Sequence, residues 1–125
     1  MTVNIVEAVR AQPDPRMRIG SLIEAGLTLP HGAEAGIRVW SSIDPQVRAV
    51  QAEVDRQRFA ALYESARDIL ESDRNAELFA AWALYLLVGY EQVTLPPDTA
   101  GLGWLVAQLL DALDSGRFTS VPERE

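Results

Sequence analysis

The sequence predicts an all-α protein built as a bundle of about six helices. Apolar residues recur at steps of three, four and seven along most of the chain, which is the spacing of one helix face. Two Asp-Pro pairs have the form of helix starts, and further Pro and Gly residues stand where helices should end. No segment is expected to form a strand. The expected helices span about 3–11, 15–27, 33–41, 45–71, 73–92 and 97–115.

The first two helices are separated by proline. The first should run from Val3 to Ala11 and stop at the Gln12-Pro13 bond, because the residue before a proline is pushed out of the helical region. The second should begin at Pro15 and be ended by Pro30. Its apolar positions are Met17, Ile19, Leu22, Ile23 and Leu27.

The third helix, from Ala33 to Ser41, is short, and the fourth is the longest. Asp44 is a good N-cap for the fourth helix because its carboxylate can accept from the free amides of the first turn. Pro45 suits the first helical position, where its missing N–H needs no partner. The helix should bury the face that carries Val47, Val50, Val54, Ala61, Leu62, Ala66 and Ile69.

The last two helices are the most apolar. The fifth should run from Asp73, its expected N-cap, to Gln92, and residues 78–88 are uncharged and apolar on every side. Such a helix must be covered all round, yet the run is shorter than the roughly 20 residues that span a bilayer. The sixth should run from Pro97 to Ser115 with Gly116 after it, and residues 117–125 should fray.

Length and charge limit the range of functions. The 125 residues are enough for one domain and not for two. Eighteen acidic residues against eleven basic ones give a net charge of −7, which repels nucleic acid and anionic membranes. The basic residues, all arginine, are scattered, so we expect neither a nucleic acid nor a membrane as a direct partner. The absence of cysteine excludes disulfides, thiolate zinc sites and a cysteine nucleophile.

No catalytic constellation can be assembled. The chain has no histidine pair, no glycine-rich phosphate loop and no Gly-x-Ser-x-Gly elbow. Glu64 and Asp68 have helical spacing but should lie on a solvated face, and the one histidine, His31, should be a solvated residue of a turn. We therefore expect no enzyme activity, no metal and no cofactor.

One segment resembles a known family. Trp40, a short turn, Asp44-Pro45-x-Val47 and then Asp55 and Arg58 resemble the core of the C-terminal domain of TetR-family transcriptional regulators. The earlier Asp-Pro-Arg at 14–16 and the order of the remaining helices agree with that resemblance over nearly the whole chain.

The resemblance implies the effector-sensing and dimerisation domain of a bacterial, cytoplasmic regulator. Residues before Asp14 leave no room for a helix-turn-helix, so we expect the regulatory half alone, a single domain over residues 1–125 without its DNA-binding domain. A stand-alone helical dimerisation or interaction module with no ligand, which could titrate a full-length regulator, is the alternative function.

The last two helices are expected to form half of an interface. A domain of this size has few helices with which to cover a helix that is apolar all round, and in the resembled family these two helices commonly pair with their copies in a four-helix bundle. A homodimer is therefore expected, while a monomer with both helices in its core and a heterodimer remain alternatives. The expected interface residues are Leu86, Gly89, Leu102, Leu105, Val106, Leu109 and Leu113.

Aromatic side chains beside small residues suggest a ligand pocket. Large flat rings leave irregular space when their neighbours are small, and the resemblance implies a small effector in the space among the second, third, fourth and fifth helices. Few polar groups are available there, which favours a neutral or mildly acidic, mostly apolar ligand; ordinary core packing is the alternative. The expected ligand-binding residues are Ile37, Trp40, Phe59, Tyr63, Trp82 and Tyr85.

Overall fold

The computed structural model describes residues 7–124, and all their regular structure is helical, as predicted. Residues 7–10 are helical, and residues 3–6 of the first expected helix lie outside the described residues. The following elements are α2 (Pro15–Leu27), α3 (His31–Ser41), α4 (Pro45–Arg67), α5 (Asp73–Gln92), α6 (Thr99–Asp114) and the short 3₁₀ helix η1 (Arg117–Thr119).

Aspartate caps start α2 and α4 as the sequence predicts. The Asp14 carboxylate accepts hydrogen bonds from the first amides of α2, at 2.8 and 3.1 Å. The Asp44 carboxylate does the same for α4, at 2.9 and 3.3 Å. Each cap satisfies two amides that have no partner within the helix, and the proline that follows has no amide to satisfy.

Other helix boundaries differ from the expectation. α3 begins at His31 rather than Ala33, and no side chain caps it, so the sequence carried no start signal. α4 ends at Arg67, four residues early, and Ser72 rather than Asp73 caps α5. α6 begins after Asp98, whose carboxylate accepts from the Gly101 amide at 2.8 Å.

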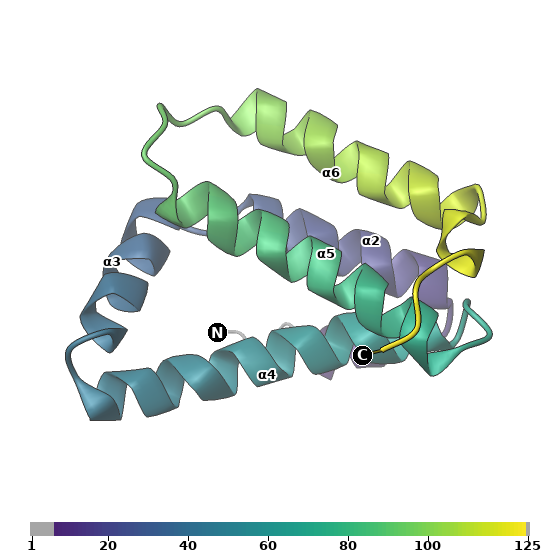
Figure 1. The fold of residues 1–125 in the computed structure, drawn as a ribbon, viewed down its shortest axis with the longest axis horizontal. Helices are drawn as coiled ribbons and strands as arrows, with labels where there is room; N and C mark the ends of the chain where they lie inside the picture. The colour runs from purple at the N-terminus through teal and green to yellow at the C-terminus, as the bar shows by residue number, and fades with distance from the viewer. Residues whose placement is uncertain (1–6, 125) are drawn as a thin grey trace.

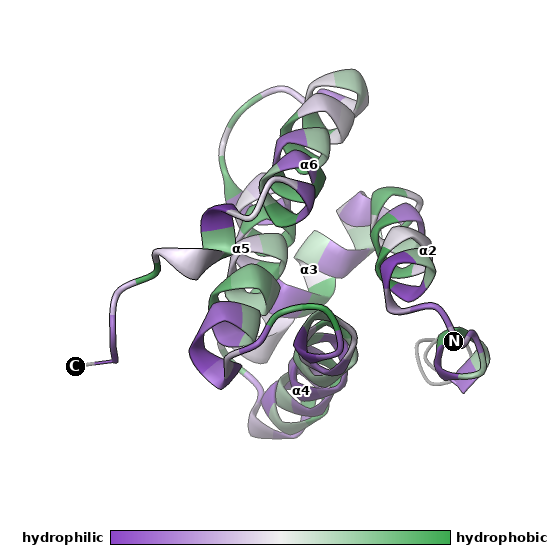
Figure 2. Cartoon of the chain, turned by 90° about the vertical axis from the view of Figure 1, so that its right-hand side faces the viewer, coloured by the Kyte–Doolittle hydropathy of each residue, from purple (hydrophilic) through white to green (hydrophobic). Residues whose placement is uncertain are grey.

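The core lies where α2, α5, α6 and the C-terminal half of α4 meet (Figure 1). Phe79, Ile19 and Leu109 are the largest side chains that are fully buried there. Figure 2 shows hydrophilic residues along much of α4, whereas α5 and α6 are mostly hydrophobic or neutral. The core residues are Ile19, Leu62, Ala66, Leu70, Ala76, Phe79, Ala80, Leu109, Ala112, Leu113 and Phe118.

The N-terminal half of α4 leaves this core. Figure 1 shows α3, α4 and α5 as three sides of a triangle, because α5 diverges from α4 and α3 joins their far ends. Val50 was expected on the buried face of α4, but 65% of its surface is exposed. The prediction was wrong there because this part of α4 lies outside the core and α3 does not cover the side that carries Val50, although Ala61, Leu62 and Ala66 are buried as expected.

The chain beyond α6 is better anchored than expected. Gly116 has φ +78°, the left-handed conformation expected of a residue that follows a helix. The backbone then turns into η1, which buries Phe118 against the rings of Phe79 and Trp82 with both centroid distances at 5.7 Å. Residues 117–119 are therefore not frayed, contrary to the prediction.

Within residues 7–124, no helix combines the length and the hydrophobicity that crossing a membrane requires.

Candidate functional site

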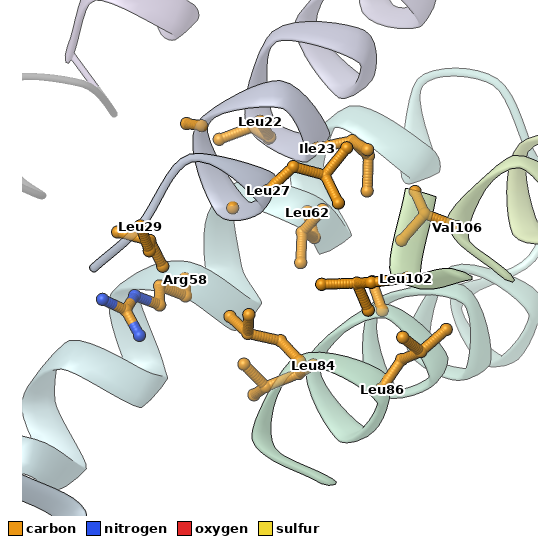
Figure 3. Close-up of a pocket in the computed structure, with 14 residues that line it drawn as sticks. Leu22, Ile23, Leu27, Leu29, Arg58, Leu62, Leu84, Leu86, Leu102 and Val106 are labelled. Carbon is orange, nitrogen blue, oxygen red and sulfur yellow. The ribbon is translucent and has the colours of Figure 1, made fainter. Parts of the chain in front are cut away.

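An apolar cavity lies between α2, α4, α5 and α6 (Figure 3). Its empty volume is about 780 Å³, which includes space that opens to solvent. A single charged residue interrupts a lining that is otherwise aliphatic. The lining residues are Leu22, Ile23, Ala25, Gly26, Leu27, Leu29, Arg58, Leu62, Ala83, Leu84, Leu86, Leu87, Leu102 and Val106.

The last two helices supply one side of this cavity. α5 contributes Ala83, Leu84, Leu86 and Leu87, which span one turn, and α6 contributes Leu102 and Val106, which are four residues apart. Residues three or four apart share a helix face, as Ala83, Leu86 and Leu87 do on α5 and as Leu102 and Val106 do on α6. The faces of α5 and α6 that look toward α2 therefore form a wall of branched aliphatic side chains.

α2 supplies the opposite wall. An ion pair between Arg16 and Asp114, at 2.9 and 3.1 Å, ties the start of α2 to the end of α6. The cavity lies toward the other ends of these two helices, where α2 carries the small residues Ala25 and Gly26. A Cβ atom on Gly26 would meet nothing from the surrounding structure within 4 Å, so the space beside this wall is unfilled.

Arg58 is the one charged residue of the lining. Its side chain lies beside Leu29 at the edge of the cavity (Figure 3) and is 13% exposed. Its Nη2 donates to the carboxylate of Glu34 at 2.6 Å. Its Nη1 is buried and has no hydrogen-bond partner. An unpaired buried donor is costly, and such atoms often mark the place of a water or a ligand.

Arg58 belongs to a polar cluster inside the triangle of α3, α4 and α5. Two ion pairs, Arg38 with Asp55 and Arg58 with Glu34, and a hydrogen bond between His31 and Glu91 connect the helices. The pairs follow from spacing, since His31, Glu34 and Arg38 are three, four and seven residues apart on α3. We define the polar cluster as His31, Glu34, Arg38, Asp55, Arg58 and Glu91.

The Arg38–Asp55 pair has the strongest geometry of the cluster. Both Nη atoms of Arg38 donate to the carboxylate, at 2.9 and 3.0 Å, and Gln51 donates a third hydrogen bond at 3.2 Å. Burial raises the pKa of Asp55, but the hydrogen bonds and charge of Arg38 outweigh that effect and hold the pKa below its ordinary value. The same hydrogen bonds raise the pKa of Arg38.

Glu91 is in a less favourable environment. Its side chain is fully buried, and burial raises its pKa, although the hydrogen bond from His31 and the charge of that ring oppose the shift. Its Oε2 lies 2.8 Å from Nδ1 of His31, while its Oε1 has no partner. In the part of the chain that the structure describes, the buried unpartnered side-chain polar atoms are Arg38 Nε, Arg58 Nη1 and Glu91 Oε1, all in the polar cluster.

The prediction for His31 was wrong. Its side chain is 16% exposed, and its ring packs edge-on against Tyr90 at a centroid distance of 5.3 Å. Nε2 lies 3.3 Å from the carbonyl oxygen of Leu27, across the turn between α2 and α3. His31 belongs to α3 and not to the preceding turn, and its ring is mostly covered by Glu91, Tyr90 and the backbone of Leu27.

The six expected ligand-binding residues do not line the cavity. Ile37, Trp40 and Tyr85 are 42%, 54% and 74% exposed. Phe59 and Tyr63 stack on each other with ring centroids 6.3 Å apart and pack against the core, and Trp82 packs on Phe118. Phe59, Tyr63, Trp82 and Tyr85 lie on two of the helices that line the cavity, but on other sides of those helices, and Trp40 lies on α3, which does not line it.

Of the seven expected interface residues, five are covered within the single chain and two are exposed. Leu86, Leu102 and Val106 line the cavity, and Leu109 and Leu113 belong to the core. Gly89 and Leu105 are exposed, with 48% of Leu105 accessible. In the structure of a single chain, only Gly89 and Leu105 of these seven residues offer much surface to a partner.

A different set of apolar residues is exposed on the same two helices. Trp82, Tyr85 and Gly89 follow one another at helical spacing on α5, and Trp104 and Leu105 are neighbours on α6. Trp104 is 64% exposed and was not among the expected site residues. We call these five residues the outer face. Figures 1 and 2 show α5 and α6 side by side.

The cavity residues of α2 and α4 were also missed as a site. The periodic Leu22, Ile23 and Leu27 predicted a buried face, and Leu62 was placed in the core, but periodicity does not distinguish a filled core from a hollow one. The small residues Ala25 and Gly26 beside those leucines were the available signal.

Residues 7–124 contain no group of three or more His, Cys, Asp or Glu side chains placed to hold a metal ion. Neither a family model, nor a curated protein, nor a solved structure matches this chain.

Proposed function

We propose that the chain is an effector-sensing and dimerisation domain of the TetR type, which binds a small, mostly apolar ligand in the cavity between α2, α4, α5 and α6. The observation that carries the proposal is that α5 and α6 contribute residues both to the cavity lining and to the outer face. Leu86, Leu102 and Val106 line the cavity, whereas Trp104 and Leu105 are exposed on the outer face. A ligand in the cavity would contact the helices that form the proposed interface.

The proposed mechanism is a population shift. A ligand changes the arrangement of a dimer only to the extent that it binds one arrangement more tightly than another. The position of the cavity supports such a difference in affinity, because a change in the packing of α5 or α6 against α2 would change the shape of the cavity. The second copy is proposed as the partner because the outer face is apolar and because the resembled family pairs these two helices.

Direct DNA binding is not part of the proposal, and the charges of the chain support this. Ten of the eleven arginines form ion pairs with carboxylates. The remaining one, Arg48, donates to the carbonyl oxygens of Ser41 and Ser42 at 3.1 Å. Arginines with such partners do not form the patch that phosphate binding requires. We propose a cytoplasmic regulator whose ligand response acts through its dimer.

The ligand part is tested with the neutral dye N-phenyl-1-naphthylamine, whose fluorescence rises in apolar surroundings. The wild type should bind it saturably with one site per chain. Ala83→Phe, which puts a ring into the cavity, should weaken binding at least about tenfold while circular dichroism shows an intact helical fold. Ala49→Phe, on the exposed side of α4, is the control and should not change the affinity.

Two results would contradict the ligand part: no saturable binding by the wild type, or equal affinity of Ala83→Phe and the wild type. A third variant, Trp104→Ser, should retain the affinity, because it removes a ring from the outer face and not from the cavity.

A helical dimerisation module without a ligand is the second candidate function. The exposure of Trp104 and Leu105 favours it independently of the cavity. A dimer in solution together with no saturable dye binding would support this candidate over the first.

A further inference from the structure

We propose that the cavity binds a hydrocarbon, or the hydrocarbon body of a larger molecule, by burial alone and forms no hydrogen bond with it. This inference rests on the proposed function, because it names the ligand class of the same cavity.

The first observation is the composition of the wall. Of the fourteen residues that line the cavity in the described part of the chain, thirteen are aliphatic or glycine. None of the thirteen has a hydroxyl, amide or charged side-chain group with which to bind a polar ligand atom, and none has a ring on which a flat ligand could stack. The attraction that these side chains offer is the removal of apolar ligand surface from water.

The second observation is the direction of the Arg58 side chain. Figure 3 shows its nitrogen atoms pointing away from the aliphatic side chains of the lining. Nη2 donates to Glu34 of α3 at 2.6 Å, and Nη1 is buried. The cavity is therefore in contact with the apolar stem of Arg58 and not with its charge.

The third observation concerns the C-terminal end of α2, where the backbone is thinly covered because residues 25 and 26 are alanine and glycine. The last carbonyl oxygens of a helix have no partner within it and could accept from a ligand. In this structure the carbonyl oxygens of residues 24 and 25 accept from Thr28 at 3.1–3.2 Å, and that of Gly26 accepts from the Leu29 amide at 3.4 Å. The carbonyl oxygen of Leu27 lies 3.3 Å from Nε2 of His31 on α3. The acceptors at this end of α2 thus have partners within the chain.

The start of α6 is closed in the same way. The amide of the lining residue Leu102 donates to the carbonyl oxygen of Asp98 at 2.9 Å, and the amide of Gly101 donates to the Asp98 carboxylate at 2.8 Å. A polar ligand group inside the cavity would lose its hydrogen bonds to water without replacement, which is the situation of a polar group transferred from water into an alkane. A hydrocarbon has no such bonds to lose.

The test compares decalin with 2-decalone and 2-decalol, which have nearly the same size and add an acceptor or a hydroxyl group. Dissociation constants are measured by competition with N-phenyl-1-naphthylamine. The water–hexadecane partition coefficients of the same probes supply the reference for surroundings that form no hydrogen bonds.

Decalin should displace the dye from the wild type. Each polar probe should bind more weakly than decalin by the factor that the partition coefficients give, to within about threefold, whereas a hydrogen bond from the lining would strengthen its binding at least about tenfold beyond that factor.

Leu86→Asn supplies a donor that the wild-type lining lacks. Leu86 lines the cavity, whereas the neighbouring Tyr85 is 74% exposed on the outer face, so Tyr85→Asn is the matched control. The affinity for 2-decalone relative to decalin should rise about tenfold in Leu86→Asn and stay unchanged in Tyr85→Asn, with circular dichroism showing that both variants are folded.

Three results would overturn the inference and leave the proposed function intact: a polar probe that binds at least about tenfold more tightly than its partition coefficient predicts, an unchanged ratio in folded Leu86→Asn, or failure of decalin to displace bound dye. The absence of saturable dye binding would overturn the proposed function itself.

Discussion

Arg38 and Asp55 form a bidentate ion pair that fastens α3 to the middle of α4, with nitrogen–oxygen distances of 2.9 and 3.0 Å. The side chain of Arg38 is 17% exposed and that of Asp55 is 30% exposed. Because the N-terminal half of α4 has left the core, this pair and the Arg58–Glu34 pair hold α3 against it. Ion pairs therefore connect α3 to α4 in a region that the apolar core does not reach.

Replacing Asp55 by Asn should destabilise the fold by about 2 kcal/mol at pH 7, because a half-buried guanidinium loses its charged partner. Urea unfolding followed by circular dichroism measures the difference. Glu53→Gln is the control: Glu53 pairs with Arg56 on the exposed side of α4, so its loss should change stability by less than about 0.5 kcal/mol. Equal effects of the two substitutions would show that the buried pair does not fasten α3.

The effect of Asp55→Asn should also depend on pH. The pKa of Asp55 is lowered in the folded state, so its contribution is present above the unfolded pKa of about 3.9 and is lost as the pH falls through the folded value. The difference between wild type and variant should therefore shrink at pH 3. A difference that does not change between pH 7 and pH 3 would contradict the assignment.

Glu91→Gln should have the opposite pH dependence. The pKa of Glu91 is raised in the folded state, mainly by burial, so the wild type loses stability as the pH rises from the unfolded value through the folded one. Glutamine has no charge to bury and can still hydrogen-bond His31. The melting temperature of the variant should rise relative to wild type between pH 4 and pH 8. Glu71→Gln, at an exposed position, is the control; a relative decrease for Glu91→Gln would refute the prediction.

The sequence predicted the fold best where local chemistry determines it. Asp44 and Pro45 start α4 because a carboxylate cap and a proline at the first position are both local preferences, and the structure confirms them. Gly116 takes the left-handed conformation expected after a helix. α3 was misplaced by two residues because Pro30 and His31 carry no capping signal.

The site was harder to predict because it depends on how helices diverge. The spacing of Gln51, Asp55 and Arg58 was visible in the sequence, but charged residues on one helix face usually indicate solvent. In this structure the charged face of α4 contacts the charged face of α3 and not solvent. In the same way, the periodicity of Val106 and Leu109 showed that one side of α6 is covered, but not whether the covering residues belong to the same chain or to a second copy.

Leu105→Arg should convert the proposed dimer into a folded monomer. Leu105 is 48% exposed in the single chain, so an arginine there can reach solvent in a monomer but would be buried in an interface. Leu109→Arg is the contrasting change: Leu109 is fully buried, and a charge there should cost more than about 4 kcal/mol and unfold the protein. Sedimentation velocity and circular dichroism distinguish the two results. A wild-type monomer, or a dimer that survives Leu105→Arg, would refute an interface at this position.

Gly89→Ala separates the stability of one chain from the strength of the proposed dimer. A Cβ atom on Gly89 would meet nothing within 4 Å in the single chain, and alanine favours a helix over glycine by up to about 1 kcal/mol, so the monomer should become more stable. If Gly89 lets two copies of α5 approach closely, the added methyl group should nevertheless raise the dimer dissociation constant. Gly36→Ala, at an equally open position in α3, should give the same gain in stability with an unchanged dissociation constant. Sedimentation equilibrium measures that constant and urea unfolding measures the stability, and equal dissociation constants for the two variants would remove Gly89 from the interface.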